Sequence, residues 1–143
     1  MYLLDTNVVS ELRKPRPRGA VLAWVEAVND ADLYLGSAVT LAEIQAGIEL
    51  TRDQDPNKAD EIEHWQNPLA GAYNILPMDV IVFRQWAKLM RRQSDTLYAD
   101  AMIAATARVH SLTVVTRHVA DFKPFGVKLL NPFLWPKGRG LNG

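Results

Sequence analysis

The first twelve residues constrain the fold more than any other segment. Residues 2–4 form a short apolar run without alternation, which is typical of a strand buried on both faces. Asp5, Thr6 and Asn7 follow at once and can each cap a helix, and apolar side chains then recur at helical spacing as far as Leu12. A strand that turns directly into a helix places Asp5 at the carboxyl end of a central strand, where ligands bind in open α/β sheets. Taken alone, Asp5 is equally well explained as the N-cap of the helix.

Strand and helix patterns alternate along the rest of the chain. Further apolar runs predict strands over residues 33–35, 73–77, 112–116 and 127–130, with amphipathic helices between them. This alternation predicts an α/β fold, a three-layer α/β/α sandwich around a mostly parallel sheet. A chain of 143 residues with 48% hydrophobic composition fits one domain. We assign residues 1–136 to that domain and predict a flexible C-terminal tail over residues 137–143.

Composition limits the partners and the cellular compartment. Sixteen basic and sixteen acidic residues cancel, so an anionic substrate must be attracted by a local patch or by a metal ion. The absence of cysteine excludes disulfides and thiolate chemistry and fits a reducing compartment. The sequence contains neither a signal-peptide pattern nor an apolar run of the roughly 20 residues that span a membrane. We therefore expect a cytoplasmic protein that does not contact membranes.

A basic loop follows the first predicted helix. Two prolines and a glycine interrupt regular structure there, and four cations lie within six residues: Arg13, Lys14, Arg16 and Arg18. One interpretation is a solvated connector stiffened by proline. The other is a phosphate-contacting rim close to Asp5, in which the cations position a nucleic acid without reading its sequence.

Two further carboxylates occupy informative positions. Asp100 shares a helical face with the apolar residues Leu97 and Ile103, and an unpaired buried charge costs several kcal/mol, so such a group usually has a partner or binds a metal. Glu43 lies near the start of a predicted helix over residues 37–48. Thr40 and Glu43 also match a capping box, which offers a structural explanation for Glu43.

Asp5, Glu43 and Asp100 together indicate a hard metal ion. Oxygen ligands without cysteine or a closely spaced histidine pair favour Mg²⁺ or Mn²⁺ over zinc. Mg²⁺ usually binds through one or two carboxylates and a substrate phosphate, and this arrangement suits hydrolysis of a phosphodiester bond.

Four motifs resemble those of the PIN-domain ribonucleases. They are LLDTNVVSE at residues 3–11, VTLAEI at 39–44, ADAMIAATA at 99–107 and LTVVTRHVADF at 112–122. The resemblance is strongest to the VapC toxins of bacterial type II toxin–antitoxin pairs, including the FitB-like branch, and it runs in order from residue 2 to about residue 135.

The resemblance implies both a fold and a set of site residues. The five-stranded sheet would have the strand order 3-2-1-4-5. Asp5 and Asp100 would bind Mg²⁺, and Glu43 would bind it directly or through water. Thr6 and Thr116 would support the site by hydrogen bonding.

The sequence departs from the family pattern at the fourth acidic position. Some relatives carry an acid directly after the Thr-Arg pair, but here His118 follows Thr116 and Arg117, and the nearest carboxylate is Asp121. Asp121 either reaches the metal from one helical turn away or caps a short helix. His118 either donates to a phosphate or leaving group or has no catalytic role, and the number of metal ions stays open.

The resemblance also implies a function. It predicts a Mg²⁺-dependent endoribonuclease, with Mn²⁺ able to substitute, that acts as a toxin on structured RNA, most often tRNA. A cognate antitoxin with a DNA-binding domain would inhibit it, and the toxin would form a homodimer. The alternatives are a non-catalytic PIN-like module that binds RNA or a partner, and an acidic-site phosphatase or phospho-receiver. The last is disfavoured because Asp5 lacks the second Asp two residues on that many aspartyl phosphatases use.

Overall fold

A parallel five-stranded sheet forms the centre of the molecule in a computed structural model that describes residues 1–28, 32–68 and 74–136. Its strand order, β3-β2-β1-β4-β5, confirms the order that the family resemblance implies, and the pairings between neighbouring strands are parallel. The strands are β1 (Tyr2–Leu4), β2 (Leu33–Ser37), β3 (Asn74–Leu76), β4 (Thr113–Val115) and β5 (Leu129–Leu130). The chain reverses its direction of travel across the sheet at β1, which therefore lies between β2 and β4.

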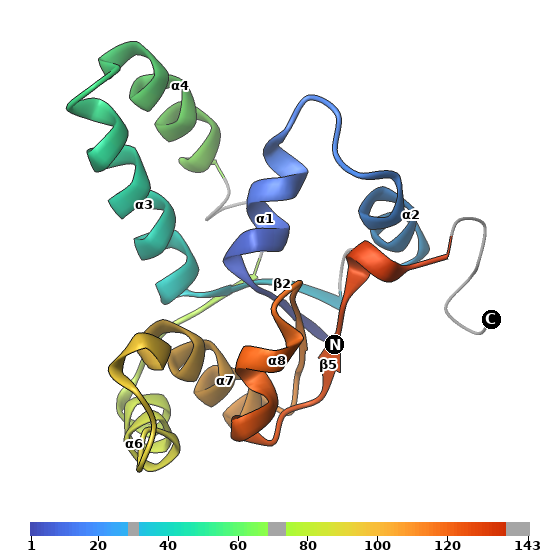
Figure 1. Ribbon diagram of the computed structural model, residues 1–143, viewed down its shortest axis with the longest axis vertical. Coiled ribbons are helices and arrows are strands. Elements are labelled where there is room, and N and C mark those ends of the chain that lie inside the picture. The colour runs from blue at the N-terminus through green and yellow to red at the C-terminus, as the bar shows by residue number, and fades with distance from the viewer. Residues whose placement is uncertain (29–31, 69–73, 137–143) are drawn as a thin grey trace.

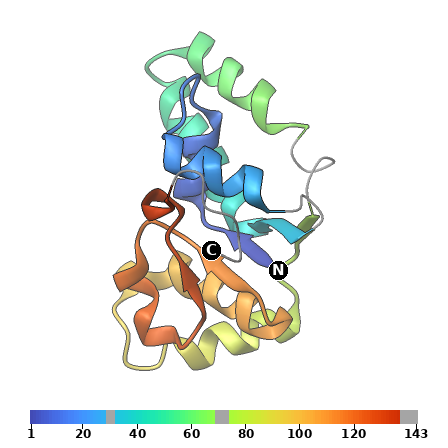
Figure 2. The same ribbon diagram turned by 90° about the vertical axis from the view of Figure 1, so that its right-hand side faces the viewer.

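Helices cover both faces of the sheet and complete three layers (Figures 1 and 2). One side holds α1 (Thr6–Arg13) and α2 (Gly19–Ala27), and the pair α3 (Ala38–Arg52) and α4 (Pro56–Gln66) extends beside α1. The other side holds α6 (Val80–Leu89), α7 (Tyr98–His110) and the short α8 (Val119–Phe122). The chain also forms short 3-10 turns, namely η2 (Asp95–Leu97), η3 (Lys123–Phe125) and η4 (Pro132–Leu134).

The two central strands bury side chains on both faces, as their uninterrupted apolar sequences predict. Leu4 and Val115 join the cluster beneath α1 and α2, in which Trp24 is fully buried. Leu3 and Val114 point the other way, into the cluster formed with α7 and α8. Because both faces of β1 and β4 are packed, their carboxyl ends are held firmly at one edge of the sheet.

Two local predictions differ from the structure. The capping box is wrong: α3 begins before it, with Ser37 as the N-cap accepting from the Val39 N–H at 3.1 Å. Thr40 is instead buried, and Glu43 turns toward another helix. The amphipathic pattern also predicts a helix from Asp79 through Arg92, but that helix ends at Leu89.

Some predictions fall on residues whose structure is not described. Tyr73, at the start of the predicted third strand, lies outside the described residues, and so does the proposed tail over residues 137–143. Among the helices of the described ranges, none combines the length and the apolarity needed to cross a bilayer.

Candidate functional site at the carboxyl edge of the sheet

Asp5 ends β1 and begins α1, so it serves as a helix cap and as a site carboxylate at once. Its Oδ1 accepts from the Thr6 N–H at 2.8 Å, which is the N-cap contact. Its Oδ2 accepts from the Thr116 hydroxyl and from the Asn7 side-chain amide, both at 2.8 Å. Burial raises the pKa of the Asp5 carboxyl, and these hydrogen bonds partly oppose the rise. The two explanations considered for Asp5 therefore do not exclude each other.

Glu43 lies on the first turns of α3 and faces α1. The Thr6 hydroxyl donates to Glu43 Oε1 at 2.8 Å, which joins two segments 37 residues apart. Glu43 is an exposed residue as a whole, but partial burial of its carboxyl group raises its pKa, and the charge of Asp5 adds to the rise. Thr6 thus connects the capping turn of α1 to the second acidic group.

Asp100 is a half-buried residue in the first turn of α7. Burial raises the pKa of Asp100 to about 6, and the negative charges of Asp5, Asp121 and Glu43 contribute to the rise. Carboxylates from three other segments are therefore close enough to Asp100 to act on it. The fold brings the three acids singled out in the sequence to one place, together with Asp121.

Asp121 and His118 lie on the turn that follows β4. Asp121 does not cap α8, because His118 occupies the N-cap position and Asp121 lies within the helix. The capping interpretation of Asp121 is therefore wrong. His118 Nδ1 is 3.9 Å from Asp121 Oδ2, and both side chains are more than half exposed. Both face solvent beside the acidic group, where a substrate can reach them.

Asn7 links three parts of the site, although no local pattern in the sequence distinguishes it as functional. Its side-chain amide donates to Asp5 Oδ2 and, at 3.2 Å, to the Thr116 hydroxyl. Its Oδ1 accepts from the backbone N–H of Arg117 at 3.0 Å. The Thr116 hydroxyl also accepts from the His118 N–H at 2.9 Å. The segment after β4 is thereby fixed to the segment after β1.

The basic loop is held in place by a buried carboxylate. Glu11 of α1 is 3% exposed, and its Oε2 lies 3.0 Å from Lys14 Nζ while its Oε1 lies 3.9 Å from Arg18 Nε. Arg16 is exposed. Arg13 lines a hollow of about 240 Å³ between α1, α3 and α4, which Thr6 and Glu43 also line. Glu11 therefore ties Lys14 and Arg18 to α1, while the side chains of Lys14 and Arg16 remain exposed to solvent.

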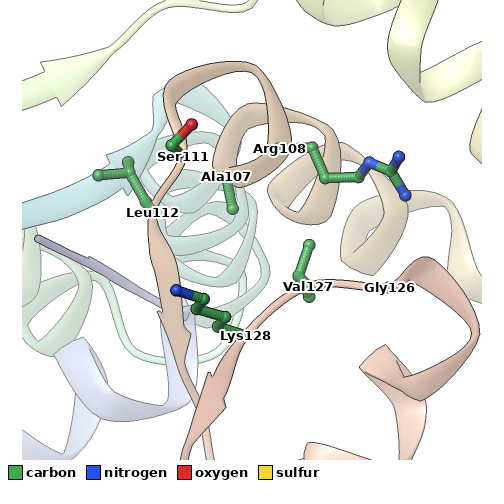
Figure 3. A pocket seen from close by; sticks show the side chains of 7 residues that line it. All are labelled: Ala107, Arg108, Ser111, Leu112, Gly126, Val127 and Lys128. Carbon is green, nitrogen blue, oxygen red and sulfur yellow. The ribbon is translucent and has the colours of Figure 1, made fainter.

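A larger hollow, of about 340 Å³, lies at the opposite edge of the sheet (Figure 3). It is bordered by residues that precede β4 and β5, including Ser111 and Lys128, and by the end of α7. None of the site residues predicted from the sequence lines it. The acidic group, and not the larger hollow, is the candidate functional site.

Comparison with known proteins identifies the family. The family model described as the PIN domain matches residues 2–119, which is most of the chain. The chain belongs to the PIN-domain family. The resemblance inferred from the four sequence motifs is thereby confirmed.

Relatives resemble this PIN domain over nearly their whole length. VapC ribonuclease Y4jK of Sinorhizobium fredii is 38% identical over 143 residues, covering 93% of this chain and 98% of the relative. Toxin FitB of Neisseria gonorrhoeae is 37% identical over 139 residues, covering 93% and 99%. In the solved structure of FitAB bound to the IR36 DNA fragment, a chain aligns with a TM-score of 0.80 at 33% identity, covering 97% of this chain and 100% of that one.

The donor set of this PIN domain fits a hard divalent ion held by few direct protein ligands. Within the described ranges, no three His, Asp or Glu side chains are arranged so that they could ligate one ion together. Mg²⁺ ordinarily binds through one or two carboxylates and keeps several waters, so two acidic groups suffice. Burial and the neighbouring carboxylates raise the pKa of Asp100, and a cation there would oppose both effects by favouring the charged carboxylate.

The metal-free protein is expected to lose stability as the pH rises. The pKa of Asp100 is about 6 in the folded chain against an ordinary value of 3.8. Between these values the folded chain binds a proton that the unfolded chain has released, so the free energy of unfolding falls with increasing pH. The whole shift corresponds to about 3 kcal/mol, and solvent screening of this half-buried group reduces the expected fall to about 2 kcal/mol or less. Urea unfolding in EDTA at about pH 5 and about pH 7.5 should show this fall, and Asp100→Asn should lack that part of it. The same pH dependence in wild type and Asp100→Asn would contradict a raised pKa at Asp100.

Proposed function

We propose that this PIN domain is a metal-dependent endoribonuclease that acts as the toxin of a type II toxin–antitoxin pair. The observation that supports it is the convergence of Asp5, Glu43, Asp100 and Asp121 at the carboxyl edge of the sheet, where the other three charges act on Asp100. The names of the relatives, a VapC ribonuclease and the toxin FitB, support the same conclusion. A purely structural role would not require Asp100 to lie beside three other carboxylates that repel it.

The proposed chemistry is hydrolysis of a phosphodiester bond with Mg²⁺, for which Mn²⁺ can substitute. Asp5 and Asp100 would hold the ion, and Glu43 would act on it through a bound water, because no three acidic groups of the described residues are arranged to ligate one ion directly. A bound divalent ion polarises a phosphoryl oxygen and lowers the pKa of its bound water. Thr116 and Asn7 orient Asp5, and Thr6 orients Glu43, so the acidic groups need little reorganisation when substrate arrives. His118 and Asp121 face the space where the RNA strand would pass.

We place the substrate among structured RNAs, with tRNA as the leading candidate, and the protein in the cytoplasm. A cognate antitoxin with a DNA-binding domain would inhibit it, by analogy with the FitAB assembly, which binds a DNA fragment. The hollow lined by Thr6, Glu43 and Trp65 supports inhibition by an antitoxin, because a peptide segment bound there would reach the acidic groups from the α3–α4 side. We further propose that the toxin forms a homodimer.

The experiment that tests the function is incubation of purified protein with total tRNA, with Mg²⁺ and with EDTA. Specific cleavage products that require the metal would support the endoribonuclease. RNA that is bound but never cut with Mg²⁺ or Mn²⁺ would favour the non-catalytic binding module instead. Release of inorganic phosphate without RNA cleavage would favour the phosphatase.

A further inference from the structure

Two arginines from distant segments lie over one aromatic ring beside the acidic site. The Arg117 Cζ lies 4.7 Å from the ring centroid of Phe133, and the Arg18 Cζ lies 5.9 Å from the same centroid. Arg117 follows β4, Arg18 precedes α2, and Phe133 lies in η4, which packs against α2. A cation over an aromatic face is attracted by the ring, so Phe133 fixes where both guanidinium groups lie.

Arg117 is connected to the acidic site through its backbone. Its N–H donates to Asn7, whose amide donates to Asp5, so the arginine and the first carboxylate share one hydrogen-bonded unit. Arg18 is restrained separately by the buried carboxylate of Glu11. Both cations are therefore held in place, unlike the long basic side chains that usually move freely on a surface.

The charge of Arg117 is not balanced by the protein. Across residues 1–28, 32–68 and 74–136, no carboxylate lies within ion-pair distance of its exposed guanidinium. Lys14 and Arg18, in contrast, both form ion pairs with Glu11. Two cations that share one ring repel each other, and an anion between or beside them would lower that cost. A neutral protein with an acidic site also needs a local attraction to hold a polyanion there.

We propose that Arg117 and Arg18, positioned over Phe133, bind backbone phosphate groups of the RNA strand next to the bond that is cut. This inference rests on the proposed function and adds a substrate-binding surface to it. The guanidinium fork suits phosphate oxygens, and contacts to phosphate position a strand without reading its sequence. Arg117 contributes more to phosphate binding than Arg18, because the charge of Arg18 is partly neutralised by its ion pair with Glu11.

The test compares RNA binding by Arg117→Gln with binding by Lys128→Gln. Lys128 is an exposed cation at the far edge of the sheet, where it lines the hollow in Figure 3, so its variant controls for the loss of one charge. The probe is total tRNA in EDTA, with the dissociation constant measured over a range of salt concentrations. Arg117→Gln should raise the dissociation constant about tenfold and reduce the slope of log K against log salt by about 1, whereas Lys128→Gln should change neither.

Two further variants separate phosphate binding from a structural role. Arg117→Lys keeps the charge but loses the planar stacking on Phe133, so it should recover part of the affinity lost in Arg117→Gln. In cleavage assays with Mg²⁺, Arg117→Gln should raise KM and change kcat little. A thermal midpoint that falls in Arg117→Gln and Arg117→Lys alike, with KM unchanged, would mean that Arg117 only packs Phe133 and would overturn the inference.

The outcomes also distinguish this inference from the proposed function. If wild type cleaves tRNA but Arg117→Gln binds it with unchanged affinity and salt slope, the inference is wrong and the nuclease remains. The arginine pair would then serve a protein partner instead. If neither wild type nor any variant binds or cleaves RNA, both proposals are wrong.

Discussion

Asp100→Asn is expected to slow metal-dependent RNA cleavage by at least about a hundredfold. The substitution keeps the size of the side chain but removes the charge that would hold the metal ion. A hundredfold slower rate corresponds to the loss of about 3 kcal/mol of transition-state stabilisation. That loss is a modest share of the stabilisation that a bound metal ion supplies. The measurement is the single-turnover cleavage rate of a tRNA substrate at saturating Mg²⁺.

The fold of this variant should survive, which separates lost chemistry from lost structure. Asp100 is repelled by Asp5, Asp121 and Glu43 in the metal-free protein, so neutralising it removes an unfavourable interaction. We therefore expect a free energy of unfolding at neutral pH that equals or exceeds that of wild type. Asp60→Asn is the matched control, because Asp60 is 68% exposed on α4, away from the acidic group, and pairs with Arg52. Equal cleavage by wild type and Asp100→Asn would exclude Asp100 from the chemistry.

Thr116→Val is expected to reduce both activity and stability. The buried hydroxyl of Thr116 donates to Asp5 Oδ2 and accepts from Asn7 and from the His118 N–H. Valine has nearly the same shape but satisfies none of these groups, and unsatisfied buried polar groups cost about 1–3 kcal/mol. Outer groups that orient a metal ligand typically contribute about 10–100-fold to metal affinity or activity. Urea unfolding and the cleavage rate measure the two effects.

Thr116→Ser is the control for this prediction. Serine keeps the hydroxyl and loses one methyl group, so most of the activity should return. Removing the Thr116 hydroxyl also takes away a hydrogen bond that lowers the pKa of Asp5, so in Thr116→Val the pKa of Asp5 should rise further. If valine and serine reduce activity equally, packing at this position matters and the hydrogen bonds do not.

The sequence predicted the parts of the site that follow from topology. Asp5 ends a central strand and Asp100 begins the helix that precedes the neighbouring strand, so a parallel sheet brings them to one edge. The strand order itself came from resemblance to the PIN family, because apolar runs predict strands without predicting which strands are neighbours. Local pattern and family knowledge together therefore accounted for the fold and the main acids.

Features that depend on contacts between distant segments could not be read from local patterns. Thr40 and Glu43 fit a capping box in spacing, but Ser37 lies at the strand end and takes the capping position first. In the sequence, Asn7 is one of three adjacent residues that can cap a helix. Only the fold shows that its side chain accepts a hydrogen bond from the backbone of Arg117. The buried position of Glu11 was equally hidden, since its partners lie in the following loop and it occurs on an otherwise ordinary helix.

The central claim is that Asp5 and Asp100 together hold a divalent ion. The most direct measurement is calorimetric titration of Mn²⁺ into wild type, Asp5→Asn, Asp100→Asn and the Asp60→Asn control, each checked for folding by its thermal midpoint. We predict Mn²⁺ binding by wild type and the control, and at least about tenfold weaker binding by each of the other two variants. Equal Mn²⁺ affinity in all four proteins, or none in wild type, would contradict the claim that these carboxylates form a metal site.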